Sequence, residues 1–152
     1  MERGGDCRGL PASRYLLPAT LMKVIKADKL GWCFGVERAV DMAFAEGAKA
    51  GGPVATLGPI IHNPQMVEKL KAKSVGVVEE PGELPRGGRM VVSAYGAPRQ
   101  AYEEAAAKGI QVIDTTCPYV TRGHKLVEQL LQDGYGIVIV GDRGHQEVEG
   151  LL

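Results

Sequence analysis

Short apolar runs alternate with longer amphipathic stretches along this chain. A run of four or five apolar residues between turn-forming residues is typical of a buried strand, and apolar positions spaced three or four apart are typical of a helix. The expected strands are residues 23–27, 54–57, 75–78, 89–92, 110–113 and 137–140. The expected helices are residues 34–49, 65–73, 98–108 and 119–132. This alternation predicts the α/β class, with small parallel sheets and crossover helices.

The pattern also divides the chain into segments. Residues 1–21 have scattered charges, glycine and proline without periodicity, so we expect a disordered N-terminal extension, with Met22 as the natural start. Residues 22–95 predict a first α/β domain. Residues 96–152 predict an incomplete second α/β domain, because the chain stops at Leu152, where the next helix should begin.

The composition narrows the class of protein. Lys plus Arg and Asp plus Glu number 18 each, and this balance gives no reason to expect nucleic acid or a membrane surface as a partner. No apolar run approaches the ~20 residues that a transmembrane helix needs. The three cysteines are widely spaced and odd in number, which argues against a secreted disulfide framework. We therefore expect a cytoplasmic protein, in which Cys7 is an incidental thiol.

Cys33 and Cys117 both stand where a predicted strand gives way to a predicted helix. Pro118 suits the first turn of a helix, since its missing N–H would have no partner there. The helix dipole and backbone amides lower the pKa of a thiol at such a position, and ligands bind at the carboxyl ends of strands in open α/β sheets. These positions predict metal ligands or nucleophiles. The alternative is a small buried residue, which is the usual environment of a free cysteine.

Further polar residues occupy the other strand-end loops, namely His62, Tyr95, His145 and Glu147. Helix N-termini that meet there would offer backbone donors to a phosphate group, and imidazoles would add charge-assisted hydrogen bonds. A carboxyl group such as that of Glu147 can carry protons. The residues alone therefore predict a redox or metal site for a phosphorylated substrate.

Each of these residues also has a purely structural interpretation. His62 could cap or cover its loop, and His145 could pack on a loop neighbour. Tyr95 could be buried with its hydroxyl group bonded to the backbone. Glu147 could favour the N-terminus of the next helix through the helix dipole. His124 lies inside a predicted helix, where we expect a structural role or an indirect supporting role rather than direct contact with a ligand.

Several sequence blocks resemble a known enzyme family. Residues 31–39, G-W-C-F-G-V-E-R-A, resemble the G-[FW]-C-x-G-V-x-R-A signature of 4-hydroxy-3-methylbut-2-enyl diphosphate reductase, also called the LytB family. The resemblance continues in residues 61–63 (I-H-N), 114–121 (D-T-T-C-P-Y-V-T) and 144–150 (G-H-Q-E-V-E-G). The blocks follow the order and spacing of the family, and together they cover nearly everything after Met22.

The resemblance implies a trefoil of three α/β domains around a central [4Fe-4S] cluster, which three cysteines hold, one per domain. It implies reductive dehydroxylation of 4-hydroxy-3-methylbut-2-enyl diphosphate to isopentenyl and dimethylallyl diphosphates in the non-mevalonate isoprenoid pathway. The implied electron donor is ferredoxin or flavodoxin. Cys33 and Cys117 resemble two of the cluster ligands. His62 and His145 resemble diphosphate-binding residues, and Glu147 resembles the residue that relays protons to the substrate.

Two features depart from the family pattern. Tyr95 stands in a Ser-Ala-Tyr-Gly loop where the family has Ser-x-His-Gly, so its hydroxyl group can bond a phosphate oxygen but brings no positive charge. The family is also about twice as long as this chain, and the third cluster cysteine is missing, with Cys7 a poor replacement. We therefore expect this chain alone to lack normal reductase activity.

Two alternatives to a reductase follow from the same residues. The first is a non-catalytic phosphate-binding α/β remnant that has lost the cluster, which Tyr95 and the missing cysteine favour. The second is a zinc-binding α/β protein that uses both Cys33 and Cys117 together with His62.

Overall fold

The structure is a computed structural model, and it describes residues 25–49 and 51–152. The chain divides into two units, residues 1–31 and 32–152, and the helices and strands described below belong to the second. The predicted disordered extension, residues 1–21, lies outside the described residues. The predicted strand at residues 23–27 is wrong in its described part, because residues 25–27 are exposed and have no strand beside them to share hydrogen bonds.

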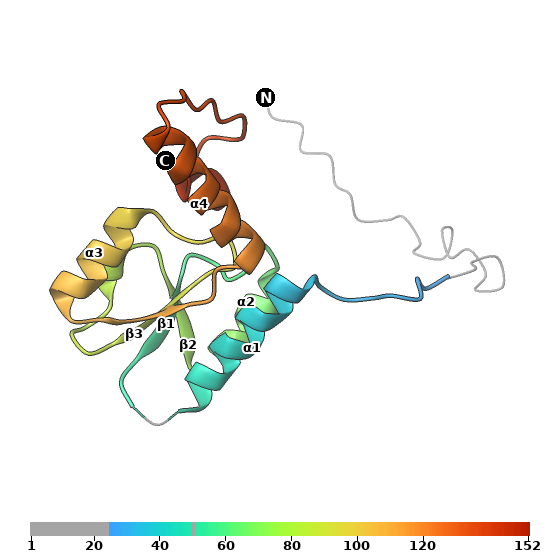
Figure 1. The fold of residues 1–152 in the computed structure, drawn as a ribbon. Coiled ribbons are helices and arrows are strands. Elements are labelled where there is room, and N and C mark those ends of the chain that lie inside the picture. The colour runs from blue at the N-terminus through green and yellow to red at the C-terminus, as the bar shows by residue number, and fades with distance from the viewer. Residues whose placement is uncertain (1–24, 50) are drawn as a thin grey trace, which may run out of the picture. The chain divides into compact units, whose positions relative to one another are not determined.

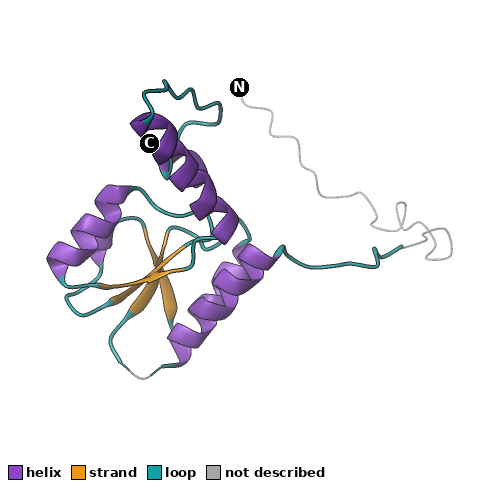
Figure 2. Ribbon diagram, in the orientation of Figure 1, coloured by secondary structure: helices purple, strands orange, loops and turns teal. Residues whose placement is uncertain are grey.

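In the described part of the chain, four parallel strands form one sheet in the order β2-β1-β3-β4 (Figures 1 and 2). They are β1 (Val54–Leu57), β2 (Val75–Val78), β3 (Arg89–Val92) and β4 (Gln111–Asp114). The first three match the predicted strands, and β4 begins one residue later than predicted. The parallel pairing with intervening helices confirms the α/β class.

Helices connect the strands, as the apolar spacing predicts, and their observed ends differ from the predicted ones by at most two residues. The observed helices are α1 (Phe34–Ala48), α2 (Pro64–Lys71), α3 (Arg99–Lys108) and α4 (Pro118–Gln132), with the short α5 (Gln146–Glu149) and the 3-10 turn η3 (Pro81–Glu83). The N-cap of α2 is Asn63, whose side chain accepts a hydrogen bond of 3.1 Å from the N–H of Met66.

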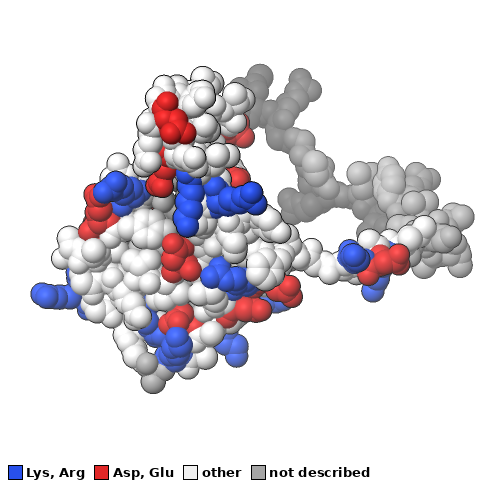
Figure 3. All heavy atoms as spheres, in the orientation of Figure 1, with Lys and Arg blue, Asp and Glu red and all other residues white. Residues whose placement is uncertain are grey.

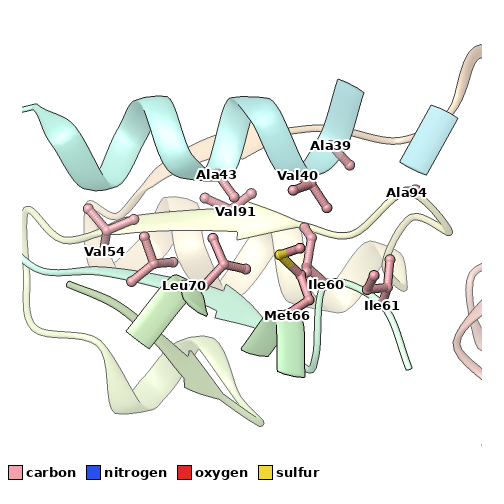
Figure 4. Packing of buried hydrophobic residues seen from close by; sticks show 11 residues of the cluster. Ala39, Val40, Ala43, Val54, Ile60, Ile61, Met66, Leu70, Val91 and Ala94 are labelled. Atoms are coloured by element: carbon pink, nitrogen blue, oxygen red, sulfur yellow. The ribbon is translucent and has the colours of Figure 1, made fainter. Parts of the chain in front are cut away.

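The core has two parts, one on each face of the sheet. On one face, α1 and α2 cover Val54 and Val91, which Figure 4 shows between apolar residues of the two helices. On the other face, Ala55, Met90 and Val92 pack with Ala105 of α3. Adjacent residues of one strand thus alternate between the two parts, as expected for a parallel sheet covered on both faces.

The predicted strand at residues 137–140 is wrong, because this segment has no regular structure and lies outside the sheet. It follows α4, which projects away from the sheet in Figure 1 and has no buried residue. An apolar run becomes a strand only where a neighbouring strand satisfies its backbone groups, and none does so here within the described residues.

The sheet continues past residue 95, where the sequence predicts the first domain to end, because β4 pairs with β3 along its whole length. The division into domains at this position stays a prediction. Across the residues that the structure describes, no helix has the length and apolarity to cross a membrane. Acidic and basic side chains are intermixed on the face seen in Figure 3, in keeping with the balanced composition.

Candidate functional site

Both cysteines of the described part lie at helix starts. Cys33 is the N-cap of α1 and Cys117 is the N-cap of α4, each with extended backbone angles, and Pro118 occupies the first position of α4. The carbonyl oxygen of each cysteine accepts the first hydrogen bond of its helix, from Glu37 at 3.0 Å and from Thr121 at 2.9 Å. The predicted strand-to-helix turn is therefore present at Cys117. At Cys33 the helix start is present, but the residues before it are not in a strand.

The turn that carries Cys117 is fixed to the end of β3 by several hydrogen bonds. The buried hydroxyl group of Thr115 donates to the carbonyl oxygen of Val92, and the N–H of Cys117 donates to that of Ala94 at 2.9 Å. The carboxylate of Asp114 accepts from the N–H of Thr116 at 2.8 Å. These bonds satisfy backbone and side-chain groups within the turn, so the position of the thiol is well defined.

Tyr102 of α3 reaches the same turn. Its hydroxyl group donates to Asp114 at 3.2 Å. Burial and the negative charge of Asp114 raise the pKa of Tyr102 to about 12. The phenol therefore stays protonated and holds the Asp114 carboxylate at neutral pH.

Two residues of the first helix join the helix to this turn. Arg38 donates to the backbone carbonyl oxygens of Thr115 at 3.2 Å and Thr116 at 3.3 Å. Gly35 packs so closely on Cys117 that a Cβ atom added to it would lie 2.5 Å from Sγ. Since Gly35 is two residues from Cys33, the starts of α1 and α4 lie beside each other. Cys33 is exposed and Cys117 is half-buried.

Three rings from separate loops form a second cluster. His62 follows β1, Tyr95 follows β3 and His145 precedes α5. The ring centroids are 6.2 Å apart for His62 and Tyr95, 5.9 Å for His62 and His145, and 6.1 Å for Tyr95 and His145. The structure thus brings together all three side chains that the sequence predicts to bind the substrate. We call this set the ring cluster.

Glu147 lies in the first turn of α5 and is exposed. Its N–H donates to Nδ1 of His145 at 3.3 Å. With Nδ1 acting as an acceptor, the neutral imidazole of His145 carries its proton on Nε2. The same helix therefore orients one ring of the cluster and holds the predicted proton carrier two residues away.

Two residues near the ring cluster were not singled out from the sequence. Gln146 accepts a hydrogen bond of 3.5 Å from the buried hydroxyl group of Ser93, which itself accepts from the N–H of Tyr95 at 3.3 Å. Gly58 lies against the amide nitrogen of Gln146 and has a φ of 64°. Gln146 therefore joins α5 to the loops that follow β1 and β3. Its place in the G-H-Q-E block is the sequence signal that could have indicated it.

His124 of α4 lies near the same loops. Its ring lies against Gly96 and Gly150, and its Nε2 atom is buried without a hydrogen-bond partner among the described residues. Gly96 has a φ of 88°, a backbone conformation that favours glycine. The ring thus fills the space between the Tyr95 loop and the end of α5, in keeping with the structural role expected for it.

The described residues offer few groups of side chains that could bind a metal ion. Within residues 25–49 and 51–152, no group of three His, Cys, Asp or Glu side chains is arranged to hold a metal ion. The zinc site made of Cys33, Cys117 and His62 is therefore not formed. The two thiols at adjacent helix starts fit two corners of an iron–sulfur cluster, because thiolates and helix N-termini suit such a group. Further ligands would have to come from outside the described residues.

Known proteins of one family resemble this chain in sequence. The family model described as LytB protein matches residues 24–152. The chain is 43% identical over 131 residues to the 4-hydroxy-3-methylbut-2-enyl diphosphate reductase of Anaeromyxobacter sp. (strain Fw109-5), covering 86% of this chain and 46% of that protein. It is 42% identical over 133 residues to the enzyme of the same name from Thermoanaerobacter sp. (strain X514), again with coverages of 86% and 46%.

Solved structures give the same result. A structure of (E)-4-hydroxy-3-methyl-but-2-enyl diphosphate reductase, described as the terminal enzyme of the non-mevalonate pathway, matches with 44% identity and a TM-score of 0.71, covering 80% of this chain and 43% of that one. The Plasmodium falciparum E-1-hydroxy-2-methyl-but-2-enyl-4-diphosphate reductase matches with 30% identity and a TM-score of 0.76, covering 80% and 38%. The chain spans a little under half the length of the curated relatives it matches.

Proposed function

Because the chain belongs to the LytB family, we propose that it supplies part of the active site of a 4-hydroxy-3-methylbut-2-enyl diphosphate reductase. The reaction removes the substrate's hydroxyl group as water, using two electrons and two protons, and yields isopentenyl and dimethylallyl diphosphates. The observation that carries the proposal is the ring cluster, in which three loops place His62, Tyr95 and His145 within 6.2 Å of one another. It lies at the carboxyl end of the sheet, where α/β proteins bind their ligands.

In this proposal the ring cluster binds the diphosphate. The imidazole N–H groups of His62 and His145 donate to phosphate oxygens, and Nε2 of His145 is free to do so because Nδ1 already accepts from the backbone. The Tyr95 hydroxyl group donates a further, uncharged hydrogen bond. The exposed carboxyl group of Glu147 relays protons to the departing hydroxyl group.

Cys33 and Cys117 are proposed as two ligands of a [4Fe-4S] cluster. When bound, the cluster supplies electrons and an iron that acts as a Lewis acid. The turn around Cys117, with Arg38 and Gly35 packed on it, holds the two thiols at adjacent helix starts. A third thiolate comes from outside the described residues, the electron donor is a ferredoxin or flavodoxin, and the reaction takes place in the cytoplasm.

Anaerobic reconstitution with iron and sulfide tests this function. It is applied to the chain alone and to a fusion in which Leu152 is followed by the part of the Anaeromyxobacter relative beyond the matched region. We expect about four irons and turnover with a chemical reductant for the fusion, and neither for the chain alone. Replacement of Cys117 by Ser should abolish both iron binding and turnover of the fusion. The control Cys7→Ser should retain iron binding and turnover. A folded fusion without iron or turnover would contradict the proposal.

A second candidate is the non-catalytic phosphate-binding remnant. It is favoured by Tyr95 in place of the family's histidine and by the presence of only two thiols among the described residues. This candidate predicts that the reconstituted fusion binds inorganic pyrophosphate but lacks the absorbance band near ~400 nm that iron–sulfur clusters give. A brown fusion that turns over substrate would exclude it.

A further inference from the structure

A cavity of about 590 Å³ lies between α1 and α4, whose starts are side by side in Figure 1. Three basic side chains, one carboxylate and two threonines make up most of its polar lining, namely Arg38, Arg122, Lys125, Asp114, Thr116 and Thr121. None of these residues belongs to the ring cluster. The cavity is therefore a polar site of its own, and the proposed function does not use it.

Positive charge exceeds negative charge in this cavity, because three cations line it with one carboxylate, that of Asp114. Among the ion pairs formed between described residues, none includes Arg38, Arg122 or Lys125. Asp114 is engaged by neighbouring donors, among them the hydroxyl group of Tyr102 at 3.2 Å. An anion bound between the three cations would relieve their mutual repulsion, so the cavity favours an anionic ligand.

Arg38 is held in place by the protein itself. Its Nη1 atom donates to the carbonyl oxygens of Thr115 at 3.2 Å and Thr116 at 3.3 Å. Its Nη2 and Nε atoms make no hydrogen bond to any described residue, and neither atom is buried. Arg122 and Lys125 lie three residues apart on one side of α4, and their exposed side chains can adjust to a ligand. The cavity thus combines one fixed guanidinium group with two adaptable cations.

A phosphate group suits this lining better than a carboxylate does. Guanidinium groups bind phosphate oxygens in pairs, ammonium groups bind them as point charges, and hydroxyl groups add further donors. A phosphate ester carries about −1.5 to −2 charges at neutral pH, which balances the excess of two positive charges, whereas a carboxylate carries one. The chain has 18 basic and 18 acidic residues, so it has no broad positive field to attract a large acidic partner. A hollow of this size instead fits a small molecule.

We propose that this cavity binds a small phosphorylated molecule, at a site separate from the one proposed for the diphosphate substrate. The three basic side chains contact the phosphate oxygens, and Thr121 donates from its hydroxyl group. Thr116 and Pro118 line the cavity on either side of Cys117 in the sequence, so a bound ligand also stabilises the turn that carries this thiol. The proposal stands on this cavity alone and does not depend on the function proposed above.

Titration of the full chain with inorganic phosphate tests the proposal, with backbone amide signals followed by NMR at a protein concentration at which light scattering shows a monomer. Sodium chloride at matched ionic strength is the reference. We expect saturable shifts of the amides of residues 114–125, with a dissociation constant of about 1 mM at pH 8. Shifts of the ring-cluster loops report separately on the proposed function. Shifts confined to those loops, or shifts that grow without saturation, would overturn the proposal.

Neutral substitutions assign the binding to particular side chains. The double variant Arg122→Gln, Lys125→Gln keeps exposed polar side chains and should raise the dissociation constant for phosphate at least about tenfold. The matched control Lys69→Gln, Lys73→Gln removes two exposed positive charges elsewhere and should leave this constant unchanged. Equal weakening in the two double variants would reduce the effect to overall charge and overturn the proposal. Binding of a hexaglutamate peptide without binding of phosphate would instead assign the cavity to an acidic polypeptide, and would also overturn it.

Discussion

At the scale of single residues, the contact between Gly35 and Cys117 is the most restrictive feature of the thiol pair. A Cβ atom at Gly35 would lie 2.5 Å from Sγ and 2.9 Å from Cβ of Cys117, well inside van der Waals contact. Gly35→Ala must therefore push the two helix starts apart. We expect a loss of about 1–3 kcal/mol in the free energy of unfolding, measured by urea denaturation, and reduced iron loading in the fusion.

The control for this variant is Gly123→Ala. Gly123 lies within α4, and beyond its chain neighbours and the backbone of its own helix no atom lies within 4 Å of an added Cβ. Alanine is the better helix former, so this substitution should be neutral or stabilise by up to about 1 kcal/mol. Equal losses of unfolding free energy in Gly35→Ala and Gly123→Ala would show that the close approach of Gly35 to Cys117 is unimportant.

Tyr95 is the member of the ring cluster that carries no imidazole. Tyr95→His would add an imidazole that is protonated below its ordinary pKa of about 6.5. A charged donor bonds a phosphate oxygen more strongly than a neutral phenol, so we expect pyrophosphate to bind about tenfold more tightly at pH 6, with a smaller gain at pH 8. Titration calorimetry at both pH values measures this, with Tyr95→Phe as the control. A gain that does not depend on pH would argue against charge as the cause.

At the scale of elements, a buried ion pair fixes α1 to β3. Arg89 donates to the carboxylate of Glu46 at 2.8 Å and also to the backbone carbonyl oxygens of Glu46, Lys49 and Gly52. Hydrogen bonds from Lys49 and Arg89 hold the pKa of Glu46 below its ordinary value of 4.5 against the effect of burial. A lowered pKa stabilises the fold above pH 4.5, and this contribution disappears as the pH falls through the folded-state pKa.

Removing the Arg89 side chain should therefore lower the free energy of unfolding much more than removing one partner of an exposed ion pair. We expect Arg89→Leu to lose about 3 kcal/mol at pH 7, because it leaves several carbonyl groups without their donor and the Glu46 carboxylate with Lys49 alone. The control Arg99→Leu breaks an exposed pair with Glu103, in which the side chains are 90% and 63% exposed, and should cost under about 0.5 kcal/mol. Thermal unfolding from pH 3 to 7 measures both. A similar small loss in the two variants would contradict the role given to Arg89.

The elements also explain which parts of the structure the sequence could predict. The strands β1 to β3 and the helices α1 to α4 carry their signals locally, in apolar runs and in caps such as Asn63. The meeting of His62 and Tyr95 was predictable because parallel strands end at one edge. His145 joins them although the strand predicted before it is not formed. The roles of Gly35 and Gln146 could not be predicted, because they depend on how segments that are distant in the sequence pack together. The prediction of a strand at residues 137–140 was wrong for the same reason, because an apolar run does not reveal whether a neighbouring strand exists.

At the scale of the whole molecule, two exposed apolar regions govern behaviour in solution. They are the apolar side of α4, where Leu126 and Leu131 are 56% and 55% exposed, and the apolar segment at residues 137–140. An unpaired apolar segment is a common site of self-association. We therefore expect the chain alone to form polydisperse oligomers as its concentration rises, measured by light scattering. The variant Val138→Lys, Val140→Lys should shift the chain toward monomer without changing its unfolding midpoint by more than a few degrees, because both side chains lie almost fully exposed and outside the core.

Overall charge does not account for this self-association, because it is balanced at 18 basic and 18 acidic residues. Raising the salt concentration should accordingly not disperse the oligomers of the chain alone, since screening weakens charge interactions but not apolar ones. Oligomers that dissolve at high salt would point to charged surfaces instead, and the apolar side of α4 would then not be what holds them together.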